Sequence, residues 1–404
     1  MKITIVGLGY MGLPTALLIS QNEDYDVLGY DIDSRKVKMI ENGELPFEEK
    51  GLEELFNKNK ENFKATDELE ESDVFLLSLP TPINKQKRCD LSYIDSAIDS
   101  LIPILKEGNL IILESTVPPG TTKRIKKKVS QKKEGILFGY VSEKAIPGNT
   151  IYEMVHNDRV AGCDDKKSKE LMKDLYGSFV EGEIHFTDLN TAESVKLFEN
   201  TFRDVNIALA NELSKVSEDL GVNVYEVIKL ANHHPRVDIL QPGPGVGGHC
   251  IAVDPWFLLQ NTTNGNLIKS SREINDKKPS DVVKRIEEVT KDIKNPKISI
   301  LGLAYKKNVD DDRESPSYTI IDLLESQNYK VSVHDPHVKN YKIDSIDKCL
   351  DNSDCIVLVT DHDYYKKIDL NDYNVRNKII VDTRDCFEKV PEDFEYHLIG
   401  SSKK

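Results

Sequence analysis

The chain has 404 residues, of which 39% are hydrophobic and 30% charged, and its formal net charge is −15. This length exceeds that of one ordinary hydrophobic core and predicts two or three domains. The negative charge disfavours a general nucleic-acid binder, because contacts to phosphates need clustered Lys and Arg.

Other sequence features bear on partners and compartment. The first residues, MKITIVGLGY, enter an apolar strand without a basic leader, and no stretch has the about 18 apolar residues of a membrane span. The six cysteines are scattered without a CxxC pair. These features predict a cytoplasmic protein without disulfides or a metal site. The one basic run, 123–133, has Ile125 and Val129 four residues apart, which predicts an amphipathic helix with a solvated basic face.

The N-terminal part predicts strands that alternate with helices. KITIV at 2–6 predicts a buried strand, GLGYMG a turn, LPTALLISQ at 13–21 a helix and VLGYD at 27–31 a second strand. Further strands are predicted at VFLLSLP (74–80), LIILES (110–115) and ILFGYVSE (136–143). Such alternation gives a mostly parallel, doubly wound sheet.

From Thr191 the pattern changes to a helix of about thirty residues without Gly or Pro, with Gly221 as its expected C-cap. A helix this long usually spans domains or forms a subunit interface. A second strand-and-helix alternation begins at KISILGLAY, 297–305. Its further strands are predicted at 329–336, 354–360 and 378–385, with a helix at 317–327.

The predicted fold class is therefore α/β, with two Rossmann-like doubly wound domains joined by a helical middle domain that contains one long helix. We expect a dinucleotide-binding domain at 1–187, a helical domain at 188–292 and a second α/β domain at 293–404. The turn after KISIL lacks the GxGxxG spacing, so the second α/β domain should bind something other than a whole dinucleotide.

GLGYMG carries the dinucleotide-binding spacing. Gly7 allows a tight turn, Gly9 lets the backbone approach a pyrophosphate, and Gly12 permits close contact of helix and strand. Asp31 ends the next strand, where a carboxylate would accept hydrogen bonds from ribose hydroxyls and repel a 2′-phosphate. The pattern predicts NAD; Arg35, four residues later, is the feature that would suit NADP.

GPGVGGHCIAVDP at 243–255 places Cys250 just after a run of glycines and Asp254 four residues later, about one turn away if a helix starts there. A cysteine is often only a small buried hydrophobe. However, a glycine run lets a bulky ligand lie against the backbone, and its exposed amides can lower the pKa of a thiol. Together with a nicotinamide cofactor, such a thiol could capture an aldehyde as a thiohemiacetal, which a second hydride transfer would oxidise to a thioester.

Lys196 and Asn200 are four residues apart and face the same side of the long helix. They are either an exposed polar pair on a surface helix or a cation and an amide that stabilise an oxyanion.

Five motifs, GLGYMGLPTA, ESTVPPGTT, TAESVKLFEN, GPGVGGHCIAVDPWFL and DDRESPS, occur in this order. Together they resemble the UDP-glucose/GDP-mannose dehydrogenase family of NAD-dependent four-electron oxidoreductases, from residue 1 to beyond 385. The stretch HHPRVDILQPGPGVGGHCIAVDPWF is most similar to the branch that oxidises UDP-N-acetyl-D-mannosamine to its uronic acid for surface polysaccharides. UDP-N-acetylglucosamine and UDP-glucose remain alternative substrates.

The resemblance implies roles for the residues of these motifs. Cys250 would be the nucleophile and Asp254 a base or water-orienting carboxylate. Lys196 and Asn200 would hold the substrate oxygen, first as an alkoxide and later as the thioester oxyanion. The product would be the C6 carboxylate, with two NADH formed per sugar.

Thr116 would hold a catalytic water, which Glu143 would help to activate. Around Glu143 the chain departs from the usual Pro-Glu-Arg, because it has Ser142 and Lys144. Pro147 stands where the UDP-glucose enzymes carry a second glutamate. These departures weaken the assignment of Glu143 and favour an N-acetylhexosamine substrate.

The remaining site expectations are these. NAD contacts are expected at Gly7, Gly9, Tyr10, Met11, Gly12, Asp31, Arg35, Thr81, Thr116 and Arg313. UDP-sugar contacts are expected at Lys196, Asn200, Arg236, Gly247, Gly248 and Lys306, with the UDP part on the C-terminal domain. We expect a homodimer through the long helix, with larger assemblies left open, and assign no role to His249.

Two other functions remain open from the sequence alone. A two-electron dehydrogenase of the β-hydroxyacid type shares the N-terminal fold, but it needs neither a thiol nor a UDP site. A non-catalytic NAD-binding scaffold would need no Cys250 and Asp254 arrangement. The number of NADH formed per substrate separates these possibilities: two, one or none.

Overall fold

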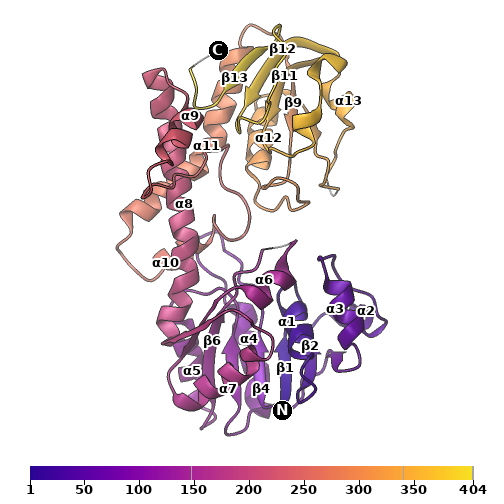
Figure 1. Cartoon of the computed structure of the whole chain (residues 1–404), viewed down its shortest axis with the longest axis vertical. Helices are drawn as coiled ribbons and strands as arrows, with labels where there is room; N and C mark the ends of the chain where they lie inside the picture. The colour runs from indigo at the N-terminus through magenta and orange to yellow at the C-terminus, as the bar shows by residue number, and fades with distance from the viewer. Residues whose placement is uncertain (147, 340, 403–404) are drawn as a thin grey trace. The chain divides into compact units, whose positions relative to one another are not determined.

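The computed structural model of the chain describes residues 1–146, 148–339 and 341–402. Pro147, one of the departures from the family pattern, lies outside them. The chain divides into two compact units (Figure 1). Unit 1 comprises Met1–Glu199 and Trp256–Thr263, and unit 2 comprises Asn200–Pro255 and Asn264–Lys404. The three domain boundaries expected from the sequence stay a prediction.

Unit 1 is built on an 8-stranded sheet of order β3-β2-β1-β4-β5-β6-β7-β8. Its strands are β1 (Lys2–Val6), β2 (Asp26–Tyr30), β3 (Phe63–Thr66), β4 (Val74–Leu77), β5 (Leu110–Leu113), β6 (Leu137–Ser142), β7 (Arg159–Cys163) and β8 (Ile184–Thr187). All neighbours pair in parallel except β6 and β7, which are antiparallel. The order reverses between β1 and β4, the point at which doubly wound sheets bind ligands.

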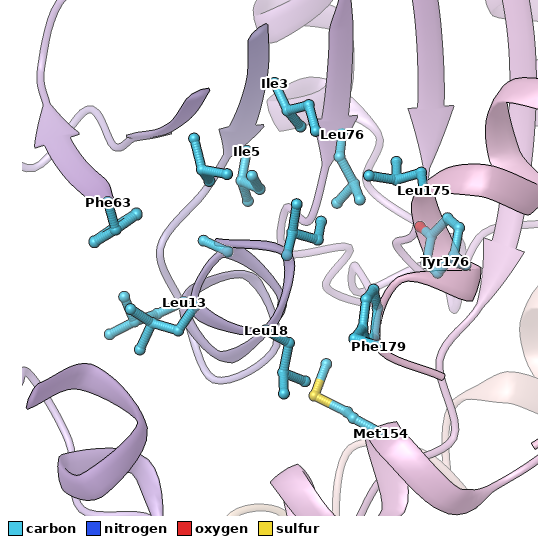
Figure 2. Close-up of a cluster of buried hydrophobic side chains, with 14 of the residues drawn as sticks. Ile3, Ile5, Leu13, Leu18, Phe63, Leu76, Met154, Leu175, Tyr176 and Phe179 are labelled. Carbon is cyan, nitrogen blue, oxygen red and sulfur yellow. The ribbon is translucent and has the colours of Figure 1, made fainter. Parts of the chain in front are cut away.

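Helices cover both faces of this sheet, so its central strands are apolar along their whole length. Figure 2 shows one core, in which Ile3, Ile5 and Leu76 of the sheet pack against Leu13 and Leu18 of α1. The helices of unit 1 before the long helix are α1 (Gly12–Ile19), α2 (Ser34–Glu41), α3 (Leu52–Asn59), α4 (Ser92–Leu101), η1 (Ile102–Ile104), α5 (Thr121–Ser130), α6 (Thr150–His156) and α7 (Lys166–Gly177).

The basic run forms α5, as predicted. Ile125 and Val129 are buried in the core on the second face of the sheet, whereas Arg124 forms an ion pair with Asp95. The basic face is therefore the solvated side of an amphipathic helix.

The predicted long helix is α8 (Leu189–Leu220), and the boundary between the units falls inside it. It ends at Gly221, whose φ of +73° and the hydrogen bond from the Val222 N–H to the Ser217 carbonyl confirm the expected C-cap. Asn223 then caps α9 (Val224–Ala231) by accepting hydrogen bonds from two backbone N–H groups.

Unit 2 contains a second, 5-stranded sheet of order β10-β9-β11-β12-β13, parallel throughout. Its strands are β9 (Lys297–Leu301), β10 (Lys330–His334), β11 (Ser353–Leu358), β12 (Val375–Asp382) and β13 (Glu395–Leu398). The other helices of this unit are α11 (Asn266–Thr290), α12 (Pro316–Ser326), α13 (Ile346–Leu350), η2 (Tyr365–Lys367) and η3 (Leu370–Asp372). The boundary between the units falls inside α10 (Asp254–Leu259). The predicted fold class is confirmed, and none of the helices within the described ranges is long and apolar enough to span a membrane.

Candidate active site

The turn between β1 and α1 contains the predicted pyrophosphate contacts. Gly7 has φ +101°, and a Cβ there would lie 2.5 Å from the Ser78 carbonyl oxygen. A Cβ on Gly12 would lie 1.8 Å from the Gly7 carbonyl oxygen. By contrast, nothing lies within 4 Å of a Cβ placed on Gly9. The fold itself therefore requires glycine at 7 and 12, whereas the open backbone at Gly9 fits a bound pyrophosphate.

Tyr10 and Met11 occupy the same turn. Tyr10 is 48% exposed, and its ring lies against that of Phe47 with centroids 4.3 Å apart. Met11 packs against the core around α1. Their contacts with NAD stay a prediction.

Asp31 follows β2 and is buried. Its Oδ2 accepts a hydrogen bond from the Leu8 N–H at 2.9 Å and lies 2.6 Å from Nζ of Lys36. The carboxylate is thus tied to the fingerprint turn, where a ribose hydroxyl would reach it. Arg35 instead pairs with Asp33 and has a 90% exposed side chain. Lys36 is therefore the cation paired with Asp31, and the contact of Arg35 with NAD stays a prediction.

Thr81 and Thr116 meet at the carboxyl ends of β4 and β5. Thr81 Oγ1 donates a hydrogen bond to the Thr116 carbonyl oxygen at 2.7 Å. Beside them, the Leu79 N–H donates to Ser115 Oγ at 2.9 Å. These contacts hold the two post-strand segments together at the edge of the sheet where ligands bind.

Glu143 follows β6 and is buried. Its Oε2 accepts a hydrogen bond from Arg159 at 2.7 Å, and its Oε1 accepts the backbone N–H groups of Lys144 and Ala145, both at 2.7 Å. Every partner is a donor, which suits an ionised carboxylate. The motif gave no sign of Arg159, and the role of Glu143 in activating water stays a prediction.

Lys196 and Asn200 are one turn apart on α8, and both are half-buried. Asn200 Nδ2 donates a hydrogen bond to Asp254 Oδ2 at 2.6 Å. Asp254 is buried, so this contact satisfies a carboxylate oxygen that solvent hardly reaches. Two of the predicted catalytic residues are therefore brought together, although they are far apart in sequence.

Cys250 is exposed and lies at the start of the turn that leads into α10. Its carbonyl oxygen accepts hydrogen bonds from the N–H groups of Val253 and Asp254, at 3.0 and 2.9 Å. Asp254 therefore follows Cys250 by one turn, as the sequence predicted. The exposed thiol of Cys250 and the buried carboxylate of Asp254 therefore belong to the same turn.

The glycines before Cys250 pack against the protein itself. A Cβ on Gly247 would lie 2.7 Å from the Glu314 carbonyl oxygen, and one on Gly248 would lie 3.0 Å from the Tyr305 ring. The Gly248 N–H also donates to the Arg313 carbonyl oxygen at 3.0 Å. Close approach of the segment after β9 thus already requires these glycines, and their contact with a substrate stays a prediction.

The other predicted binding residues lie at the surface of unit 2. Arg236 and Lys306 are exposed. Arg313 forms an ion pair with Asp311. His249 is exposed, and partial desolvation followed by the charge of Arg313 lowers its pKa. These contacts give His249 no catalytic role.

Two asparagines that the sequence did not single out hold the segment before Cys250 on α8. Asn206 accepts the Leu240 N–H at 3.1 Å, and the buried Asn211 accepts the Gly243 N–H at 2.9 Å. Asn200 and Asn211 are three helical turns apart and so face the same way. The spacing of these asparagines was the only sign in the sequence that they share a face of the helix. Their role became clear only when the structure gave their hydrogen-bond partners.

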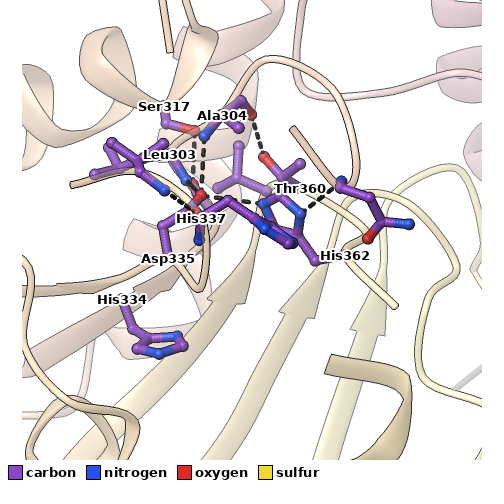
Figure 3. A network of polar contacts seen from close by, with 12 residues as sticks. Leu303, Ala304, Ser317, His334, Asp335, His337, Thr360 and His362 are labelled. Atoms are coloured by element: carbon purple, nitrogen blue, oxygen red, sulfur yellow. Dashed lines mark hydrogen bonds and ion pairs between the residues drawn. The ribbon is translucent and has the colours of Figure 1, made fainter. Parts of the chain in front are cut away.

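The turn after β9 repeats the backbone of the first fingerprint turn but is filled by side chains. Gly302 has φ +100°, and Asp335 accepts the N–H groups of Leu303 and Ala304. Figure 3 shows the contact of His362 with the same carboxylate, in which Nε2 lies 3.0 Å from Oδ2. Because His362 Nδ1 accepts the Asn308 N–H, Nε2 is the donor. These donors hold the pKa of Asp335 far below its usual range. The other oxygen, Oδ1, accepts the N–H groups of His337 and Val338. The protein itself therefore occupies both oxygens of Asp335, in agreement with the expectation of a different ligand.

Three models of one family match the chain. They are the NAD binding domain of the UDP-glucose/GDP-mannose dehydrogenase family at residues 1–180, its central domain at 190–277 and its UDP binding domain at 299–389. The last of these agrees with a non-dinucleotide ligand for the second α/β domain.

Individual relatives are similar over nearly the whole chain. A UDP-N-acetyl-D-mannosamine dehydrogenase of Methanococcus maripaludis is 47% identical over 402 residues, which cover 96% of this chain and 93% of the relative. One of Methanocaldococcus jannaschii is 45% identical over 420 residues, which cover 100% and 97%. The solved structure of UDP-D-ManNAc dehydrogenase from Pyrococcus horikoshii superposes with a TM-score of 0.94 at 38% identity and covers 100% of both chains.

Proposed function

The chain belongs to the UDP-glucose/GDP-mannose dehydrogenase family, and we propose that it oxidises C6 of UDP-N-acetyl-D-mannosamine from an alcohol to a carboxylate. Its NAD-binding domain and its relatives make it an NAD-dependent oxidoreductase, as predicted. Relatives named for this sugar, at 45% and 47% identity, support the choice of substrate. The observation that carries the mechanism is the contact of Asn200 with Asp254, one turn from the exposed Cys250.

The reaction needs two oxidations with a covalent step between them. NAD supplies the acceptor for the hydride of each oxidation. Cys250 adds its sulfur to the C6 aldehyde made by the first oxidation, the thiol proton passes to the carbonyl oxygen, and a thiohemiacetal forms. Loss of a hydride and the hydroxyl proton gives a thioester on Cys250. Water then displaces the sulfur and leaves the carboxylate.

Asn200 and Lys196 stabilise the negative charge that develops on the C6 oxygen. An amide nitrogen has two hydrogens, so Asn200 can donate one to Asp254 and the other to the substrate. Asp254 fixes the orientation of that amide, and Thr116 with Glu143 holds the hydrolytic water. Of the cofactor residues, the open backbone at Gly9 and the carboxylate of Asp31 fit the pyrophosphate and a ribose.

A substrate panel tests this proposal. Purified protein is given NAD with UDP-N-acetyl-D-mannosamine, UDP-N-acetylglucosamine or UDP-glucose, and NADH formation is followed. We expect kcat/KM to be highest for UDP-N-acetyl-D-mannosamine by about tenfold or more, which is ~1.4 kcal/mol of discrimination. A higher kcat/KM for either other sugar would overturn the substrate while leaving the chemistry intact.

We further propose that two copies of the chain associate through α8. Phe202, Leu209 and Val216 follow one another at intervals of seven residues and are 65%, 50% and 42% exposed. A heptad of exposed apolar side chains is typical of a helix that packs on a second helix. The double variant Phe202→Asp, Leu209→Asp should therefore be a monomer by light scattering. Leu267→Asp, an equally exposed position off α8, should leave the mass of the wild type; a wild-type monomer contradicts the proposal.

We place the reaction in the cytoplasm, where a reducing environment keeps the exposed Cys250 as a thiol. The uronic acid it forms would serve the synthesis of surface polysaccharides. The two-electron alternative is disfavoured, because it has no use for the matched UDP binding domain.

A further inference from the structure

Three buried ionisable groups meet at the carboxyl ends of β5 and β6 in unit 1. Glu114 follows β5, Glu143 follows β6 and Arg159 begins β7; their exposures are 4%, 5% and 3%. Arg159 NH1 lies 2.7 Å from Glu143 Oε2 and 4.0 Å from Glu114 Oε1. If both carboxyls were ionised, one negative charge would be buried without compensation, which is costly. One of the two carboxyls should therefore hold a proton.

The hydrogen-bond partners show which carboxyl is suited to the proton. Glu143 is surrounded by obligatory donors, Arg159 and two backbone N–H groups. The partners of Glu114 are hydroxyls, Thr15 Oγ1 at 3.4 Å and Tyr176 OH at 3.3 Å. A hydroxyl can accept a hydrogen bond as well as donate one, so it fits a neutral carboxylic acid, whereas an N–H group does not.

The surrounding charges agree with this assignment. Burial and then the charge of Glu143 raise the pKa of Glu114 to about 7, against the effect of Arg159. Burial also keeps Tyr176 neutral by raising its pKa well above the usual value. Glu143, Arg159 and Tyr176 are the titratable groups that face Glu114, from the segment after β6, from β7 and from α7.

We propose that Glu114 carries a proton in the working enzyme and acts as a positioning residue for Glu143. A neutral Glu114 does not compete with Glu143 for the positive charge of Arg159. The ion pair of Arg159 with Glu143 is therefore stronger, and it fixes the Glu143 carboxylate and the chain after it. Glu114 lies two residues before Thr116, and its partner Thr15 lies on α1, three residues after Gly12. The catalytic part of this proposal rests on the proposed role of Glu143; the protonation of Glu114 does not.

Thermal unfolding of Glu114→Gln across pH tests the protonation. A carboxyl whose pKa is raised by folding stabilises the protein below its unfolded pKa, and this stabilisation is lost as pH rises through the folded pKa. For Glu114 the loss falls between about pH 4.5 and about pH 7. Glutamine mimics the neutral acid and is insensitive to pH. The unfolding midpoint of Glu114→Gln relative to wild type should therefore rise by several degrees between pH 5 and pH 8.

Glu193 provides the matched control, because it is a buried glutamate with two obligatory donors, the Gly120 and Thr122 N–H groups, beside the Thr122 hydroxyl. An amide NH₂ would face these donors, so Glu193→Gln should lower the midpoint at both pH values. The test compares the difference between the unfolding midpoints of Glu114→Gln and wild type at pH 5 and at pH 8. If this difference falls or stays constant, the protonation of Glu114 is overturned.

Kinetics test the positioning role. KM of Glu114→Gln should equal that of wild type, and kcat should match wild type at pH 6 but exceed it above pH 7, where Glu114 of the wild type ionises. A ratio of the two kcat values that does not change with pH would overturn the positioning role. Full activity of Glu143→Gln would instead overturn the proposed function of Glu143, while the thermal result still decides the protonation of Glu114.

Discussion

Asn200 and Asp254 are 54 residues apart in the sequence, yet Asn200 Nδ2 donates a hydrogen bond to Asp254 Oδ2 over 2.6 Å. Asn200 lies on α8, and Asp254 begins α10 one turn after Cys250. Because Asp254 is only 3% exposed, water cannot readily replace its partner. This contact therefore fixes the turn that carries the proposed nucleophile against the helix that carries the proposed oxyanion donor.

Replacement of Asn200 by alanine should lower kcat by about 10²–10³, the usual effect of removing one oxyanion donor. It should also remove one hydrogen bond from the buried carboxylate of Asp254, which destabilises the fold by about 1–3 kcal/mol. Steady-state NADH kinetics and thermal unfolding measure the two effects. Ser194→Ala, a half-buried change on the same helix, should alter neither; an Asn200→Ala enzyme with wild-type kcat speaks against the oxyanion role.

The fingerprint glycines should separate into structural and binding positions. Gly12→Ala places a methyl group 1.8 Å from the Gly7 carbonyl oxygen and should prevent normal folding. Gly9→Ala meets nothing within 4 Å, so the fold should keep its stability, but the methyl group should block the pyrophosphate and raise KM for NAD. Thermal unfolding measures the stability of both variants, and titration with NAD measures binding. If Gly9→Ala and Gly12→Ala lost equal stability, the assignment of Gly9 as a binding position would be contradicted.

Asp31 should set the preference for NAD over NADP. Its carboxylate, held by the Leu8 N–H, would repel a 2′-phosphate. Asp31→Asn removes this charge and should reduce the ratio of kcat/KM for NAD to that for NADP by about tenfold, or ~1.4 kcal/mol. Asp33→Asn, a nearby carboxylate paired with Arg35, is the control. A ratio unchanged by Asp31→Asn would mean that other groups select the cofactor.

Lys278 is a buried cation that neither the sequence nor the proposed reaction explains. It is 2% exposed and donates to Ser214 Oγ at 2.7 Å. Burial and then Lys215 lower its pKa to about 8. Since folding depresses this pKa, the native state is penalised at neutral pH, and the penalty fades as pH rises from about 8 to about 10.5.

Lys278→Met should therefore stabilise the fold by about 1–3 kcal/mol at pH 7, and the gain should shrink toward pH 10. Thermal unfolding at the two pH values measures it. Lys277→Met, the exposed neighbour, should have no such effect. Destabilisation by Lys278→Met at pH 7 would show that the ammonium group contributes more than its burial costs.

Local patterns predicted the elements that depend on neighbouring residues. Gly7, Gly9 and Gly12 follow a strand and precede a helix, and Asp31 ends the next strand, so spacing alone indicated the cofactor site. The buried stripe of Ile125 and Val129 and the C-cap at Gly221 were likewise predicted correctly. Both features depend only on residues within a few positions of each other in the sequence.

Contacts between distant residues could not be predicted in this way. Arg159 pairs with Glu143 only because β7 runs antiparallel to β6, and the short segments that form β7 and β8 carry no clear strand pattern. The glycines at 247 and 248 suggested space for a ligand, but they are needed first for the approach of Tyr305. Such requirements arise from tertiary packing, which the local sequence does not encode.

The central claim is a four-electron oxidation through Cys250, and the number of NADH formed per sugar tests it most directly. A limiting amount of UDP-N-acetyl-D-mannosamine with excess NAD should yield two NADH and one uronate per sugar. Cys250→Ala should form no uronate while it still binds the nucleotide sugar, and Cys89→Ala, a half-buried cysteine, should behave as wild type. One NADH per sugar, or uronate formation by Cys250→Ala at the wild-type rate, would contradict the account.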